Sequence, residues 1–186
     1  MSPATRGGPV PAGRDPDSYD RLRRRVLWQL PTGLYLLGSR SADRRNLMAA
    51  NLVTQVATEP KLVGVAVEVG AVTHQLVRAG GAFTISLLHR GDRTLVRRFV
   101  KPVTDCEVDE HGVGTMQGVA VRASAGGLPV LAAAAAYLEC QVRHTLDLGS
   151  HSWFVGEVSD CDATPDVAAE DADILRMEDT RMSYGG

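Results

Sequence analysis

Apolar and polar residues alternate with a period of two over much of the chain, which is the pattern of β-strands with one buried face. The chain is therefore expected to be mainly β. The pattern predicts strands over residues 33–39, 46–57, 61–69 and 82–88, a weaker one over 112–123, and two more within 138–161 on either side of a turn at Gly149.

Apolar residues at helical spacing appear in shorter segments. Gly80-Gly81 closes one of them, because glycine adopts the left-handed cap at little cost. Another begins with a proline and enters an alanine run, which favours a helix. Residues 1–18 are rich in proline, glycine and charge and are expected to form a disordered tail before a domain of residues 19–186. Helices are predicted over 19–27, 71–81, 92–100 and 128–137.

The order of these elements favours an antiparallel architecture. Short helices fall between non-consecutive strands, unlike the regular βαβ alternation of a doubly wound sheet. Closure removes the edges of a sheet, so we expect a small barrel with helical plugs. A chain of 186 residues, 44% of them hydrophobic, suffices for one domain with a sizeable core.

Charge and composition argue against several classes of protein. The net charge of −2 gives no basic excess for nucleic-acid binding. No apolar run is long enough to span a bilayer, and the N-terminus lacks the apolar core of a secretory signal, so no membrane association is expected. Three widely spaced cysteines argue against a disulfide framework and for the reducing cytoplasm.

The usual patterns of metal and hydrolytic chemistry are missing from the sequence. His144, His151, Cys140 and Cys161 have none of the spacings of a zinc site, so no metal is expected. The serines lack a G-x-S-x-G context, and no G-x-G-x-x-G strand–helix unit is present. Cys140 alternates with apolar residues on the face expected to be buried, which favours an inert side chain.

The segment 44–68 places amides and small residues in an otherwise strand-like run. Small residues such as Ala49 and Ala50 let another body lie close to the backbone, and the amides of Asn46 and Asn51 can bind it. An anionic cofactor would use such side chains and backbone N–H groups. Taken alone, however, the residues favour a barrel strand whose small side chains fit a taper and whose amides face water.

Several motifs occur in a recognisable order. They are "PTGL" at residues 31–34, "NLMAANL" at 46–52, "EP" at 59–60, "FTISLLHRGDRTLVRRF" at 83–99, "LEC" at 138–140 and "GSHSWFVGEV" at 149–158. Together they resemble the flavin reductase-like family, the FMN-binding split barrels. Departures from the family pattern fall at Ala49, Asn51-Leu52, Ser86, Asp92 and Ser150, where hydroxyl, amide or acidic residues are usual.

The resemblance implies a homodimeric split β-barrel with short helices, which binds FMN, or else FAD, near the subunit interface. It places His151 near the nicotinamide of NADH or NADPH, whereas the residue alone reads as a strand-end histidine that contacts solvent. It implies no catalytic side chain. The flavin site that it implies consists of Asn46, Leu47, Met48, Ala49, Ala50, Asn51, Thr54, Ala66, Val67, Glu68, Thr73, Ser86, Leu87 and Leu88.

The function that this resemblance implies is an NAD(P)H-dependent flavin reductase. Hydride would pass from the nicotinamide to the flavin, because the cofactors carry the reaction and the protein orients them. A separate monooxygenase is a possible recipient of the reduced flavin. Two alternatives stay open: an FMN-binding electron-transfer protein or other non-reductase flavoprotein, and an FMN enzyme that acts on an organic substrate directly.

Overall fold

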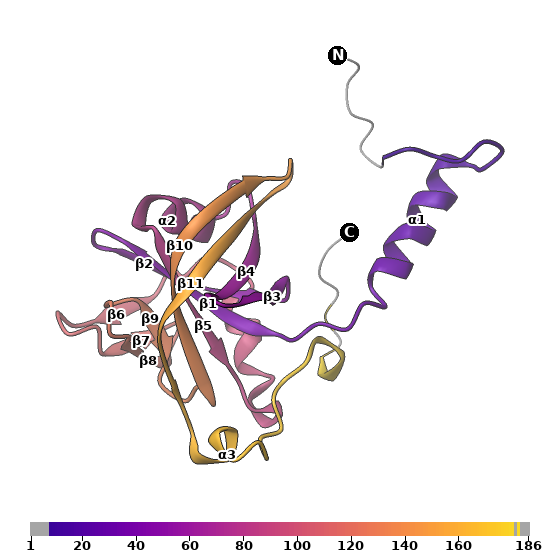
Figure 1. The fold of residues 1–186 in the computed structure, drawn as a ribbon. Helices are drawn as coiled ribbons and strands as arrows, with labels where there is room; N and C mark the ends of the chain where they lie inside the picture. The colour runs from indigo at the N-terminus through magenta and orange to yellow at the C-terminus, as the bar shows by residue number, and fades with distance from the viewer. Residues whose placement is uncertain (1–7, 181, 183–186) are drawn as a thin grey trace. The chain divides into compact units, whose positions relative to one another are not determined.

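The computed structural model describes residues 8–180 and 182, and the chain divides into two compact units (Figure 1). The smaller unit contains the N-terminal segment up to Pro31 together with the residues from 181 onward, and the larger one spans Thr32–Thr180. Every strand described below belongs to the larger unit. Residues 1–7 of the predicted tail lie outside the described residues.

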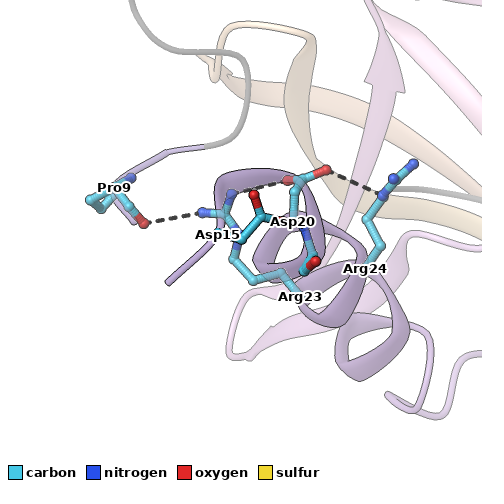
Figure 2. Close-up of polar contacts among 6 residues, drawn as sticks. Pro9, Asp15, Asp20, Arg23 and Arg24 are labelled. Atoms are coloured by element: carbon cyan, nitrogen blue, oxygen red, sulfur yellow. Dashed lines mark hydrogen bonds and ion pairs between the residues drawn. The ribbon is translucent and has the colours of Figure 1, made fainter. Parts of the chain in front are cut away.

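The first helix, α1 (Pro16–Leu27), begins two residues before the end of the predicted tail and confirms the helical spacing that follows. Its N-cap is Asp15, whose carboxylate accepts the backbone N–H three residues on at 3.0 Å. Figure 2 shows Asp20 between two arginines of the same helix, at 2.9 Å from Arg23 and 3.3 Å from Arg24. The Asp15 cap thus satisfies one backbone N–H of the first turn, and the ion pairs of Asp20 join side chains one turn apart.

A seven-stranded antiparallel sheet forms most of the larger unit. Its strands occur in the order β2-β1-β5-β10-β11-β4-β3, so the long C-terminal hairpin lies in the middle. The strands predicted in this part of the chain are confirmed, except that the run 46–57 is two strands. The bounds are β1 (Tyr35–Ser41), β2 (Arg44–Ala50), β3 (Val53–Thr58), β4 (Lys61–Glu68), β5 (Ala82–Leu87), β10 (Ala136–Asp147) and β11 (His151–Ala163).

The core of the larger unit lies on one side of this sheet. One hydrophobic cluster contains Leu37 of β1, Phe83 of β5 and Phe154 of β11, all fully buried. The same cluster contains Ala50 of β2, and the partly buried Val53 of β3 packs against it; β2 and β3 are the two edge strands. The sheet therefore curls around one core, although no ladder pairs β2 with β3 among the described residues.

A second, four-stranded sheet follows in the chain, and it corrects two sequence predictions. Its strands are β6 (Cys106–Val108), β7 (Gly114–Met116), β8 (Val119–Ala123) and β9 (Pro129–Leu131). The weaker strand predicted over 112–123 is a hairpin, since Gln117 and Gly118 both adopt positive φ between β7 and β8. The helix predicted over 128–137 is wrong: this segment contains β9, a turn and the start of β10. Leu128, Val130 and Leu131 are buried, so packing outweighs the helix propensity of the alanines.

The helices lie between the strands. α2 (Val72–Gly80) confirms the prediction for 71–81, with Gly81 as its left-handed cap. The predicted helix over 92–100 is replaced by two short 3-10 helices, η1 (Arg90–Asp92) and η2 (Leu95–Phe99). The remaining pieces, α3 (Pro165–Ala168) and η3 (Met177–Asp179), follow β11. None of the described helices is long and apolar enough to cross a membrane.

The segment after α3 runs back along the larger unit as an irregular strap. Isolated bridges join Ile174 to His89 and Arg176 to Gly33, and Leu175 between them is fully buried. The guanidinium of Arg90 lies 3.1 Å from Asp173. The strap therefore ties the end of β5 to the segment that leads into β1.

Candidate functional site

An apolar row crosses four neighbouring segments on the face of the sheet opposite the core. In the ladder, Leu146 of β10 pairs with Trp153 of β11, and Trp153 pairs with Ala66 of β4. The backbone N–H of Ala66 donates to the carbonyl of Leu52 at 3.0 Å, which places Leu52 at the end of the row. Leu146 and Leu52 are 59% and 39% exposed, so this row faces away from the core.

The indole of Trp153 lies against a glycine of the neighbouring strand. A Cβ on Gly64 would stand 2.3 Å from the six-membered ring of the indole, so only glycine accommodates the side chain in this position. Trp153 is half-buried. Sequence reasoning missed it; the available signal was an aromatic residue two positions after His151 in an alternating strand, and hence on the same face.

His151 begins β11, which confirms its predicted place at a strand end. It pairs with Glu68 of β4, one row along from the pair of Trp153 and Ala66 on the same face. Its Nδ1 lies 2.9 Å from the Ser150 hydroxyl. The structure therefore brings together three of the sequence-predicted residues, His151, Ala66 and Glu68, with Leu52 and Trp153 beside them.

Two other predicted residues, Asn46 and Thr73, are engaged inside the protein. The Nδ2 of Asn46 donates to the hydroxyl of Thr73 at 2.7 Å, and its Oδ1 accepts the backbone N–H of Val103 at 2.9 Å. Both side chains are buried. The amide of Asn46 therefore joins β2 to the first turn of α2 and to the loop that follows η2.

The remaining predicted residues divide by burial. The hydroxyl of Ser86 is buried and accepts the backbone N–H of Leu131 at 3.3 Å, so it joins the two sheets. Thr54 is exposed on β3, at the edge of the sheet. Five of the others are buried, namely Leu47, Ala49, Ala50, Val67 and Leu88, and three are half-buried, namely Met48, Asn51 and Leu87.

A hydrogen-bonded chain that the sequence did not reveal joins α2 to the β10–β11 hairpin. The Nε2 of His74 lies 2.8 Å from the hydroxyl of Ser152, which donates to Asp147 at 2.7 Å. Asp147 also accepts from Arg78 of α2 at 3.1 Å. Only the i, i+4 spacing of His74 and Arg78 was visible in the sequence, because their partners are more than sixty residues away.

Burial and the neighbouring charges keep the imidazole of His74 neutral. Burial, followed by the positive charge of Arg78, lowers the pKa of His74 below its usual 6.5. The hydrogen bond from Ser152, then that from Arg78, lowers the pKa of Asp147 below its usual 3.8. Near neutral pH this hydrogen-bonded chain therefore consists of the Asp147 carboxylate, the Ser152 hydroxyl and the neutral imidazole of His74.

An apolar cavity of about 360 Å³ lies beside the core, with the core residues Val63 and Ile85 in its wall. The phenol of Tyr35 contributes to its wall, and burial raises the pKa of that phenol. The predicted residues Thr54 and Leu87 also line it, together with Val53, Gln55, Lys61, Leu62, Val63, Ile85, Leu138, Val158 and Cys161. The cavity and the apolar row thus lie on opposite faces of the strands around β4.

Cys140 is fully buried, as predicted, and burial raises the pKa of its thiol to about 12. The protein holds it as a neutral hydrophobic side chain. Cys106 and Cys161 are exposed and free. Among the described residues, no three histidine, cysteine or acidic side chains gather as metal ligands would.

The apolar row has the chemistry and dimensions to take a planar aromatic ring. Adjacent strands lie about 4.8 Å apart, so the three segments from Leu52 through Ala66 to Trp153 span roughly 10 Å. The row is apolar, and His151 and Glu68 supply polar groups at one side. These residues fit the ring of a flavin.

Comparison with known sequences supports this interpretation. A family model described as "Flavin reductase like domain" matches residues 27–182. The chain is 34% identical over 143 residues to the NADH-dependent FAD reductase of Streptomyces globisporus, and the match covers 76% of each chain. It is 35% identical over 138 residues to the high molecular weight rubredoxin of Moorella thermoacetica, where the match covers 73% of this chain and 58% of the relative. The chain thus spans little more than half the length of that relative.

Solved structures agree with the family model. The NADH:FAD oxidoreductase of Streptomyces globisporus C-1027 superposes with a TM-score of 0.71 at 27% identity, over 96% of this chain and 98% of the other. The same oxidoreductase in complex with NAD and FAD fragments gives 0.71 at 28% identity, over 92% and 95%. The styrene monooxygenase flavin reductase of Pseudomonas putida S12 gives 0.63 at 28% identity, over 77% and 88%. This chain belongs to the family of proteins with a flavin reductase like domain.

Proposed function

We propose that the protein is an NAD(P)H-dependent flavin reductase that uses FMN or FAD. The observation that carries the proposal is the shared face of His151, Glu68, Ala66 and Trp153, in a chain that belongs to the flavin reductase family. A flavin bound there would supply the hydride-accepting chemistry. A solved relative in complex with NAD and FAD fragments supports the same pairing of cofactors.

The residues of this chain would act by binding and orientation. Leu52, Ala66 and Trp153 would contact the flavin ring, and His151 would orient the nicotinamide. Backbone N–H groups of the 46–54 segment would bind the polar parts of the flavin, as the sequence predicts. The side chains of Asn46 and Thr73 would hold that segment in place, because their polar atoms bind each other. Exclusion of water and a distance of about 3–3.5 Å between the reacting atoms would then favour transfer.

Purified protein mixed with NADH or NADPH and an excess of FMN or FAD tests the proposal. The decrease in nicotinamide absorbance over time should depend on both protein and flavin. Binding of flavin without any nicotinamide oxidation, in all four combinations, would favour the electron-transfer alternative. Absence of any saturable change in flavin fluorescence up to high micromolar flavin would contradict the whole assignment.

The assembly that we propose is a homodimer of split barrels. The apolar cavity beside the core has Leu62 and Val158 in its wall. It exposes apolar surface that a second copy of the chain would cover. Twofold dimers are the commonest oligomers of soluble proteins. Light scattering should therefore give about twice the mass of the 19.9 kDa chain at micromolar concentration, with and without flavin. A monomer mass in both conditions would refute this assembly.

A flavin-dependent monooxygenase in the cytoplasm is the partner that we propose for the reduced flavin. The likeness to the styrene monooxygenase flavin reductase supports such a partner. The free cysteines are compatible with a reducing compartment. Addition of this protein, NADH and flavin to an isolated oxygenase component that lacks its reductase should restore substrate oxidation. Restoration by chemically reduced flavin but not by this protein would argue against that role.

A further inference from the structure

Two neighbouring residues in the first turn of α2 bind in different directions. Thr73 accepts a hydrogen bond from Asn46 of β2 at 2.7 Å, whereas the ring of His74 lies 2.8 Å from the hydroxyl of Ser152 on β11. Figure 1 shows α2 along the sheet, where it packs against β1, β2, β4 and β5. The first turn of α2 is thus hydrogen-bonded both to β2, through Asn46, and to the β10–β11 hairpin that contains His151.

The direction of each hydrogen bond in the second arm follows from its end group. Asp147 is a carboxylate and can only accept, so the Ser152 hydroxyl donates to it. The same hydroxyl then accepts the Nε2–H of a neutral His74. Ser152 is fully buried and His74 is 6% exposed, so water does not replace these partners freely. The ion pair between Arg78 and Asp147 is exposed and adds little by comparison.

We propose that the chain from His74 through Ser152 to Asp147 is a positioning device for His151. Side chains alternate along β11, so Ser152 points to the core side while His151, its neighbour, points to the face of the apolar row. Anchoring Ser152 to α2 fixes the strand backbone from which His151 projects. Through Thr73 and Asn46, the same helix turn fixes the segment proposed to bind flavin. This inference rests on the proposed function, since it assigns His151 to the nicotinamide.

Ser152→Ala tests the inference because it removes the shared hydroxyl and leaves the rest of β11 in place. The Nε2–H of His74 then loses its partner, and the Oδ1 of Asp147 keeps only its hydrogen bond from Arg78. We expect the kcat/KM for NADH to fall about threefold to tenfold, while the dissociation constant for flavin stays within about twofold. Asp147→Asn alters the exposed end of the hydrogen-bonded chain and should lower kcat/KM for NADH by a smaller factor.

The matched control is Thr84→Val, elsewhere in the same sheet. Thr84 is also fully buried, and its hydroxyl donates to the carbonyl of Pro129 at 2.7 Å, so the variant loses one equally short buried hydrogen bond. Both variants should lose stability. Only Ser152→Ala should change the use of NADH. An equal change in kcat/KM in the two variants would mean that the hydrogen-bonded chain from His74 to Asp147 contributes to stability alone.

A double-mutant cycle separates positioning from a direct or general effect. If the hydrogen-bonded chain acts through His151, Ser152→Ala should have no further effect on kcat/KM for NADH in a protein that already contains His151→Ala. Additive losses would overturn the inference. If Ser152→Ala does not fold, the same cycle is measured with Asp147→Asn.

A readout that needs no turnover distinguishes failure of the inference from failure of the proposed function. The imidazole resonances of His151 should shift in Ser152→Ala and stay unchanged in Thr84→Val. Absence of that shift overturns the positioning role even in an active enzyme. A wild-type protein that oxidises no nicotinamide while the shift is present overturns the proposed function and leaves the structural coupling of Ser152 to His151 supported.

Discussion

Gly156 is the position at which the packing of the central strands is most directly testable. It lies on β11, within the "GSHSWFVGEV" motif at residues 149–158. A Cβ at this residue would stand 2.7 Å from the Cβ of Cys140 and 2.8 Å from the ring of Phe83. Both neighbours are fully buried, so neither side chain has free space into which to move.

Gly156→Ala therefore adds a methyl group to a filled core. Overpacking of this kind costs about 1–3 kcal/mol of unfolding free energy. The loss of glycine flexibility in the unfolded chain returns about 0.4–1 kcal/mol when the backbone conformation suits alanine. Gly91→Ala provides the matched control, because no atom lies within 4 Å of its added Cβ and its φ is not positive. The difference between the two variants then reports the clash alone.

Urea denaturation of both variants measures that difference. We expect Gly156→Ala to unfold with about 1–3 kcal/mol less free energy than Gly91→Ala, at an unchanged m value. For a domain of this size the corresponding fall in Tm is roughly 2–12 °C. Equal stability of the two variants would refute the contact of Gly156 with Phe83 and, with it, the packing of the Phe83 ring of β5 against β10 and β11.

Three further predictions concern single residues. His151→Ala should lower kcat/KM for NADH several-fold to about tenfold, with flavin affinity intact; loss of flavin binding instead would place His151 in the flavin site. Because the pKa of His74 is lowered, the unfolded chain takes up a proton before the folded one, so stability should be full above pH 6.5 and fall as the pH drops through the folded pKa. His74→Gln should flatten that slope in urea midpoints measured against pH, and an unchanged slope would contradict it. In the native protein, Cys106 and Cys161 should react with a thiol reagent, whereas Cys140 should react only after unfolding.

Much of the sheet could be predicted from the sequence because burial on one face imposes a period of two. The predictions failed where tertiary contacts outweighed local propensity. The alanine run after Leu131 favours a helix, yet the backbone N–H of Ala135 donates to Leu87 of β5 instead. The strand predicted over 46–57 divides at Asn51-Leu52, because the residues up to Ala50 pair with β1, whereas those from Leu52 onward pair with β4.

The candidate site was predictable only where a residue's chemistry is visible locally. His151 stands at a strand end after a glycine turn, and its place follows from that pattern. The chain from His74 to Ser152 joins residues seventy-eight positions apart, so no local pattern indicates it. The roles of Asn46 and Trp153 depend on their contacts with Thr73 and Gly64, which only the packed sheet reveals.

The central place of β10 and β11 in the strand order has a consequence for synthesis. Before residues 136–163 leave the ribosome, β5 can pair only with β1, and β4 only with β3. The seven-stranded sheet is then divided into two parts, β2-β1-β5 and β4-β3, whose open edges are exposed to aggregation. Folding of the larger unit should therefore wait for the last hairpin, and a chain released before Ala136 should need a chaperone to stay dispersed.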